Sequence, residues 1–298
     1  MQAADMRPMS TGELLDRAFT LYRRHLPLFV SLAAVPLALV CGSSILFLWH
    51  ESTEPWIDAA VRWLAQLLLS FLAYGSMLGA MSLAVSDLWL RGESSVSTCY
   101  RGLLKRQRAF LNLLLTMTIR LGGLFILIGP FPAFMVAMLL ETTDQTARLL
   151  ISMVAAAIIF GASLAVMLVA LRYGVAVPAL LNETVTARGA IKRSVALTSG
   201  HRGRVFLIAL LGVVISVVAS VVLNSPFWAA EIYWKDVEST SRLLETFSIL
   251  ADGMAVALAW PISVIAQVLL YYDLRVRTEG LDIQFLLADL ERARTVGA

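Results

Sequence analysis

The chain has 298 residues, of which 59% are hydrophobic and 15% are charged, and its formal net charge at pH 7 is +3. A soluble domain usually has about 45–50% apolar and about 25% charged residues, and at this length it buries only about three quarters of the surface of its unfolded chain. The composition therefore excludes an ordinary soluble enzyme, a disordered chain and a secreted disulfide scaffold, and it predicts a polytopic membrane protein.

Residues 1–25 form a polar N-terminal arm ahead of the first apolar run. That run is far longer than the core of a cleavable signal, and no small-residue cleavage site follows it. We expect the run to be retained as the first membrane span.

Six apolar segments are long enough to cross a bilayer core of about 30 Å, which takes roughly 20 helical residues. Backbone groups in lipid must pair within their own segment, so the segments predict helices, and the predicted fold is an all-α membrane bundle. We expect one membrane domain over residues 1–298, made of the arm, three helical hairpins over 26–272, and a tail over 273–298. The six segments are 26–49, 63–90, 109–140, 149–181, 205–224 and 247–272.

Basic residues give the bundle a predicted orientation. Eighteen of the 24 Lys and Arg residues lie in the arm, in the connections at 91–108 and 182–204, or in the tail. With six spans, these four segments all lie on the same side of the membrane. Because Lys and Arg concentrate on the cytoplasmic side, both termini are expected in the cytosol. We expect a multi-pass protein of the bacterial cytoplasmic (inner) membrane.

Amphipathic stretches lie within these basic segments and lead directly into spans. Ser10 and Glu13 have capping-box spacing at the start of the first stretch. Apolar stripes at helical spacing oppose basic residues, and the pattern recurs three times along the chain. The expected headgroup contacts are Arg17, Arg23, Arg24, Arg101, Lys105, Arg106, Lys192 and Arg193. Such helices can lie in the headgroup plane and attract anionic lipid, or they can simply pack on the ends of the bundle.

Two arginines fall inside predicted spans. Arg120 lies in the third and Arg172 in the fourth, while Asp87 and Glu183 lie nearer the inner surface, within reach of an arginine side chain. A buried arginine in a membrane faces the bundle interior or water and usually has a partner. The four residues predict either a polar cavity that opens inward or a structural ion pair.

The third span is the one most prone to interruption, because it contains two adjacent glycines and a Gly-Pro-Phe-Pro stretch at 129–132. Proline removes a helical N–H donor and clashes with the preceding turn. The pattern predicts either a broken helix, as transporters use, or a plain kink.

The C-terminal stretch LLYYDLRVRTEGLDIQFL, which begins at residue 269, resembles the signature of bacterial six-span proteins labelled as glycerophosphoryl diester phosphodiesterase membrane domains. The opening STGELLDRAFTLYRRH and the central RYGVAVPALLNE and GAIKRSVALTSG resemble the same family. The resemblance implies an integral membrane domain. It does not imply the phosphodiesterase activity, because the catalytic barrel would need about 200–400 further soluble residues.

These features lead to three functional hypotheses. The favoured one is a non-enzymatic membrane scaffold or accessory subunit that engages anionic lipid headgroups or a membrane-protein partner. The alternative is a carrier or channel for a small or lipid-like anion, which would use Arg120 and Arg172. The third, an enzyme acting on lipid headgroups, lacks a recognisable catalytic constellation. We expect no catalytic or metal site, no cofactor and no nucleic-acid partner.

Overall fold

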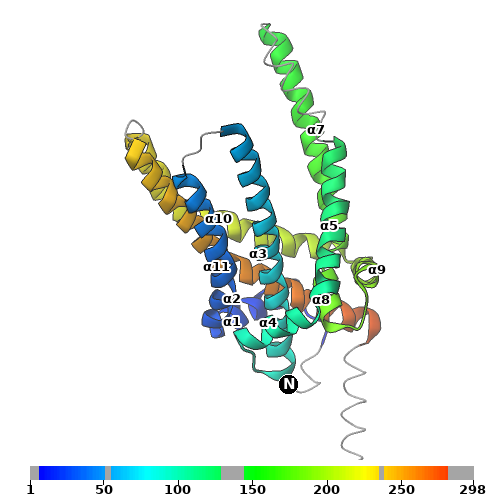
Figure 1. Ribbon diagram of the computed structural model, residues 1–298. Helices are drawn as coiled ribbons and strands as arrows, with labels where there is room; N and C mark the ends of the chain where they lie inside the picture. Colours follow the sequence, from blue (N-terminus) through cyan, green and yellow to red (C-terminus); the bar gives the residue numbers. More distant parts are fainter. Residues whose placement is uncertain (1–6, 51–54, 129–143, 235–237, 281–298) are drawn as a thin grey trace, which may run out of the picture.

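The computed structural model describes residues 7–50, 55–128, 144–234 and 238–280, and every regular element in those residues is an α-helix (Figure 1). This confirms the all-α prediction. The helices are α1 Thr11–Arg24, α2 Leu26–Trp49, α3 Pro55–Arg91, α4 Val96–Lys105, α5 Gln107–Ile128, α7 Gln145–Arg172, α8 Ala176–Asn182, α9 Ala187–Thr198, α10 Arg202–Trp234 and α11 Glu238–Glu279.

Five segments of the described chain are long and apolar enough to cross a membrane. The first predicted span coincides with α2 at both ends, and the spans predicted at 63–90, 205–224 and 247–272 lie inside α3, α10 and α11. The third predicted span begins in α5, but residues 129–140 lie outside the described residues, together with the Gly-Pro-Phe-Pro stretch. The count of six spans therefore stays a prediction.

The span predicted at 149–181 lies within a segment that is long and apolar enough to cross a membrane, Gln145–Asn182, but the helix is not continuous over it. α7 ends at Arg172, a turn occupies residues 173–175, and the short helix α8 follows. In a continuous helix, the ring of Pro178 would clash with the carbonyl four residues earlier, which belongs to Gly174. The chain relieves this clash at Tyr173, whose φ of −101° and ψ of 2° lie outside the helical region.

Three short helices, α1, α4 and α9, share one local design. Each begins at a hydroxyl N-cap that accepts a hydrogen bond from a first-turn N–H: Ser10 from Glu13 at 3.1 Å, Ser95 from Thr98 at 3.3 Å and Thr186 from Gly189 at 3.2 Å. Such caps satisfy N–H groups that a helix start leaves without a partner. In all three helices, the residues four and eight positions after the cap are buried, namely Leu14 and Ala18, Cys99 and Leu103, and Ala190 and Ser194.

Each short helix ends at a brief break and is followed at once by a long helix, which is α2, α5 or α10. His25 is the only residue between α1 and α2, and Arg106 is the only residue between α4 and α5. The short helices gather at the end of the molecule that also holds α8 and the last turns of α11 (Figure 1). We call this the basic end, and the end with the last residues of α10, the first residues of α11 and the start of α7 the opposite end.

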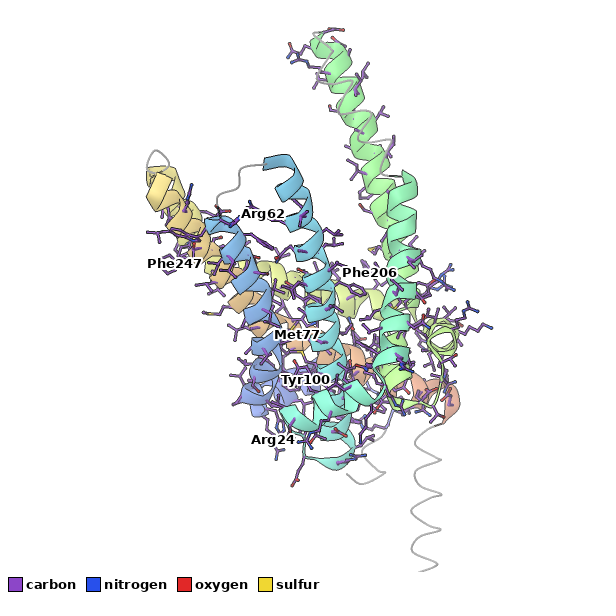
Figure 2. The ribbon with its side chains drawn as sticks, viewed as in Figure 1. Arg24, Arg62, Met77, Tyr100, Phe206 and Phe247 are labelled. Atoms are coloured by element: carbon purple, nitrogen blue, oxygen red, sulfur yellow. The ribbon has the colours of Figure 1, made fainter. Side chains whose placement is uncertain are left out.

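The packed core lies toward the basic end. It includes Phe29 and Leu32 in the first half of α2, Met77 and Met81 in the second half of α3, and Leu269 in the second half of α11, all fully buried. Figure 2 shows Met77 near the middle of the molecule, Tyr100 and Arg24 toward the basic end, and Arg62 and Phe247 toward the opposite end. The α5–α7 pair and the α10–α11 pair diverge toward the opposite end (Figure 1).

Candidate functional site

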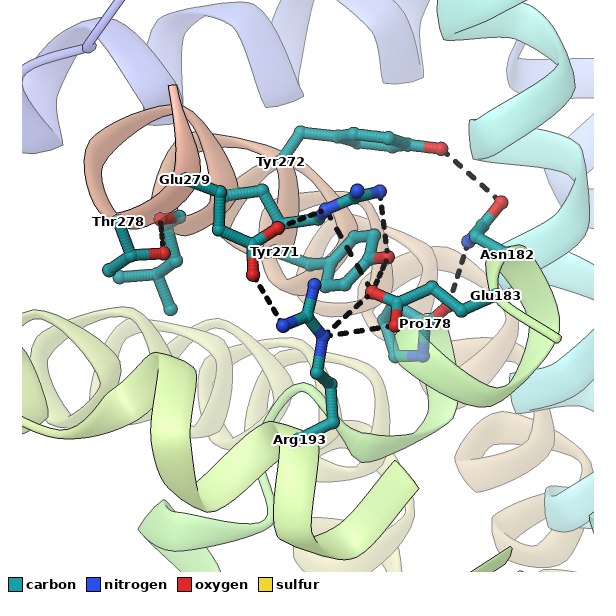
Figure 3. Close-up of polar contacts among 10 residues, drawn as sticks. Pro178, Asn182, Glu183, Arg193, Tyr271, Tyr272, Thr278 and Glu279 are labelled. Atoms are coloured by element: carbon teal, nitrogen blue, oxygen red, sulfur yellow. Dashed lines mark hydrogen bonds and ion pairs between the residues drawn. The ribbon is translucent and has the colours of Figure 1, made fainter. Parts of the chain in front are cut away.

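The last turns of α11 form an ionic network with α8 and α9 (Figure 3). The Arg193 Nε donates to the Glu183 Oε2 at 2.9 Å, and its guanidinium also pairs with Glu279. The Tyr271 hydroxyl donates to the Glu183 Oε1 at 2.7 Å, and the Arg275 Nε donates to the Glu279 Oε2 at 3.1 Å. Burial lowers the pKa of the Arg193 guanidinium, but hydrogen bonds to the two carboxylates outweigh it and raise that pKa above its ordinary value.

A second network centres on Asp273, whose side chain is completely buried. Its carboxylate accepts from the Arg204 Nη1 at 2.9 Å, the Arg277 Nε at 2.9 Å and the backbone N–H of Met9 at 2.7 Å. Both arginines also donate to the Met9 carbonyl oxygen, at 2.9 Å and 2.6 Å. The network joins the N-terminal arm to the start of α10 and the end of α11.

A third junction is made by Arg106, the residue between α4 and α5. Its Nη1 donates to the carbonyl oxygens of Leu180 at 2.9 Å, Leu181 at 3.2 Å and Glu183 at 2.9 Å. These belong to the end of α8, where a helix leaves its last carbonyls without an internal donor. A guanidinium there also suits the negative end of the helix dipole.

The eight expected headgroup contacts divide into two groups. Arg17 pairs with Glu13 at 3.2 Å and lies 5.6 Å from the centre of the Trp89 ring, while Arg106 and Arg193 hold the junctions just described. These three arginines are thus partly buried, and they stabilise contacts within the molecule. The other five side chains are exposed at the basic end: Arg23, Arg24, Arg101, Lys105 and Lys192.

The four intramembrane candidates are not brought together. Asp87 pairs with Arg91 at 3.3 Å, and Glu183 belongs to the α11 network. Arg120 is exposed and donates to the Tyr173 hydroxyl at 3.4 Å, and the Arg172 side chain is exposed as well. In the described part of the chain, no ion pair joins either arginine to Asp87 or Glu183.

A cavity of about 620 Å³ opens at the basic end where α4 meets α5. One wall is the run from Leu104 to Ala109, and the other is the end of α8 with Thr184 and Val185. Lys105, Arg106 and Arg108 line it, and no acidic residue appears among its described lining residues.

A larger cavity, about 930 Å³, lies at the opposite end between α2, α3 and α11. Its polar groups engage one another. The Gln66 side chain donates to the Ser44 Oγ at 2.9 Å and accepts from the Ser43 Oγ at 2.8 Å, and the Arg62 Nη1 donates to the Phe47 carbonyl oxygen at 2.9 Å. Most of its wall is apolar, with Trp63 and Leu67 beside Phe47.

The sequence indicates that Asp273 and Arg277, one helical turn apart, can pair locally. It does not indicate that Asp273 is the centre of a network. Met9 and Arg204 carry no such signal, since Met9 is 264 positions distant along the chain. Arg108 also escaped the list of headgroup contacts, although it lies on the basic side of its segment.

No family model, curated protein or solved structure matches the chain. Within the described residues, no group of three or more His, Cys, Asp and Glu side chains is placed to hold a metal ion. The resemblance of residues 269–286 to six-span membrane domains stays a prediction.

Proposed function

We propose that this protein is a non-enzymatic membrane scaffold or accessory subunit, and that its basic end engages anionic lipid headgroups. The observation that carries the proposal is an imbalance of charge at this end. Five of the acids there already pair with an arginine of the same end: Glu13, Asp87, Glu183, Asp273 and Glu279. The exposed cations of α1, α4 and α9 are left to attract anions from outside the molecule.

The three capped helices suit this role. Each presents a buried apolar face to the bundle and leaves basic side chains exposed. Each basic group near an anionic membrane surface contributes about 1 kcal/mol of attraction. Under the positive-inside rule, this end faces the cytosol of a bacterial inner membrane, and a membrane-protein partner could use the same surface.

The purified full chain is reconstituted into nanodiscs of mixed phosphatidylcholine and phosphatidylglycerol. The test measures the ratio of the two lipids that the protein retains and compares this ratio among wild type, a variant and a control. The variant carries Arg23→Gln, Arg24→Gln, Arg101→Gln, Lys105→Gln and Lys192→Gln. Its matched control keeps every charge, with Arg→Lys at the three arginines and Lys→Arg at the two lysines. We expect wild type and control to enrich phosphatidylglycerol several-fold at low salt, and the glutamine variant to show the bulk ratio. Equal enrichment in all three proteins would contradict the proposal.

One observation favours the alternative, a carrier for a small or lipid-like anion. Arg120 contacts Tyr173 at the break between α7 and α8, and broken helices beside intramembrane charges are a device of transporters. Arg120→Gln and Arg172→Gln, together, should then abolish anion flux into proteoliposomes while unfolding stays unchanged. If the wild type carries no anion flux and the double variant fails to fold, both arginines are structural instead.

A further inference from the structure

The cavity at the α4–α5 junction has fixed walls. Arg106 is held by three carbonyl oxygens of α8 and its connection, and Tyr100 of α4 donates from its hydroxyl to the Leu32 carbonyl oxygen at 2.7 Å. Burial raises the pKa of that hydroxyl to about 12, so it remains a donor at any physiological pH. Leu103 and Phe110 are buried on either side of the junction. A ligand would therefore meet a site that is already formed, which lowers the ordering cost of binding.

The charge of the cavity is not compensated within the molecule. Lys105 and Arg108 are exposed, and neither makes an ion pair with any residue that the structure describes. Arg106, which lies between these two residues in the sequence, adds a third positive charge, and Gln107 and Thr184 add only neutral polar groups. The three cations around this cavity repel one another, and an anion bound between them would offset that repulsion. The start of α5, where the helix dipole is positive, adds to the same field.

The surface next to the cavity favours an anion that carries a hydrocarbon chain. Leu111, Leu115 and Ile119 follow Arg108 along α5 at spacings of three and four residues, so they share its face of the helix. Their side chains are 42%, 53% and 62% exposed. An apolar strip thus runs from the cationic cavity toward the middle of the membrane.

We propose that this cavity is a binding site for the phosphate of an anionic phospholipid, with an acyl chain lying along the exposed strip of α5. Lys105 and Arg108 contact the phosphate, and Arg106 fixes the wall behind it. The inference rests on the proposed function and turns a diffuse attraction for anionic lipid into one saturable site.

The test titrates the full chain, in dodecyl maltoside, with dioctanoyl phosphatidic acid and reads the bound lipid by native mass spectrometry. The site variant is Lys105→Gln with Arg108→Gln. The matched control is Arg188→Gln with Arg202→Gln, which also removes two positive charges, from exposed positions on α9 and at the start of α10 that lie outside the cavity lining. Two further probes are used. Glycerol 3-phosphate carries the phosphate without acyl chains, and dioctanoyl phosphatidylcholine carries the acyl chains without a net charge.

We expect wild type to bind the phosphatidic acid saturably, and the site variant to bind it about thirtyfold more weakly, which corresponds to ~2 kcal/mol for two basic groups. The control should change affinity less than threefold, and all three proteins should unfold at the same temperature.

Each other outcome overturns a stated part of the proposal. An equal loss of affinity for phosphatidic acid in the site variant and the control would mean that diffuse charge attracts the lipid. The proposed site would then be wrong, but the proposed function would not be contradicted. Binding of glycerol 3-phosphate as tightly as phosphatidic acid would make the occupant a soluble phosphate. Failure of wild type to prefer phosphatidic acid to phosphatidylcholine would remove both the site and the proposed function.

Discussion

The basic end and the opposite end of this molecule are held together by different interactions. At the basic end, helices far apart in sequence meet through fully buried apolar side chains and through carboxylates that each serve two or more partners, such as Asp273 and Glu183. At the opposite end, α7 exposes Leu150 and Phe160 by 61% and 71%, and α10 exposes Val222 by 62%.

The difference follows from the two solvents that a membrane protein meets. Lipid tails are as apolar as leucine, so burial within the membrane gives little hydrophobic gain and helices there can expose apolar side chains. Near the aqueous boundary, burial and ion pairing both stabilise a fixed arrangement. α11 has 42 residues, about 63 Å at 1.5 Å per residue, so it is longer than the bilayer and can carry its polar last turns to that boundary.

The largest contrast is expected from two matched Asp→Asn substitutions. Asp273→Asn at the basic end should cost about 3 kcal/mol, because it leaves two partly buried arginines without their counter-charge. Asp252→Asn at the opposite end should cost less than about 1 kcal/mol, since its partners Ser220 and Asn224 are neutral and the amide keeps an acceptor oxygen. The measurement is unfolding in mixed micelles titrated with sodium dodecyl sulfate, and equal costs would break the comparison.

A second contrast lies within one helix. Leu32 and Leu39 are both in α2, but Leu32 is fully buried and Leu39 is 59% exposed. Leu32→Ala should destabilise by about 2–4 kcal/mol through the cavity that it leaves. Leu39→Ala should change stability by less than about 0.5 kcal/mol, because lipid fills the space of the lost side chain. The same unfolding titration checks both, and a large loss at Leu39 would show that the opposite end is packed as well.

The smallest contrast concerns two helical glycines. A methyl group on Gly79 would meet the Leu103 Cδ1 at 2.7 Å and the Phe110 Cζ at 2.8 Å, whereas a methyl group on Gly161 meets nothing within 4 Å. Gly79→Ala should therefore destabilise by about 1 kcal/mol, since crowding outweighs the better helix propensity of alanine. Gly161→Ala should be neutral or stabilise by up to about 1 kcal/mol. Shifts of the same sign in thermal unfolding would contradict this difference.

Local patterns predicted the local structure well. The apolar run at 26–49 predicted both ends of α2, and Ser10, the cap expected from its spacing to Glu13, is the N-cap of α1. The break after Arg172 had a local signal in Pro178, but its strongly apolar surroundings favoured one continuous span. The α8 helix is buried at six of its seven residues, so its apolar character reflects packing at the basic end.

The candidate site was harder to predict, because an amphipathic pattern shows which face of a helix is polar and not what that face meets. Arg101 and Arg106 belong to the same basic segment, yet Arg101 is exposed and Arg106 holds the carbonyl oxygens of α8. The difference arises because the fold brings Leu180, 74 positions later in the chain, next to Arg106. The local spacing of residues carries no signal of such a contact.

Hydrogen–deuterium exchange of the full chain in nanodiscs tests the central claim most directly, by comparing pure phosphatidylcholine with phosphatidylcholine that contains phosphatidylglycerol. If the basic end engages anionic headgroups, added protection should appear in α1, α4, α9 and the start of α5, and it should shrink as salt screens the attraction. The first turns of α7 and the last turns of α10 should exchange at the same rate in both lipids. Equal exchange in α1, α4 and α9 in the two lipids, or protection confined to the opposite end, would contradict the account.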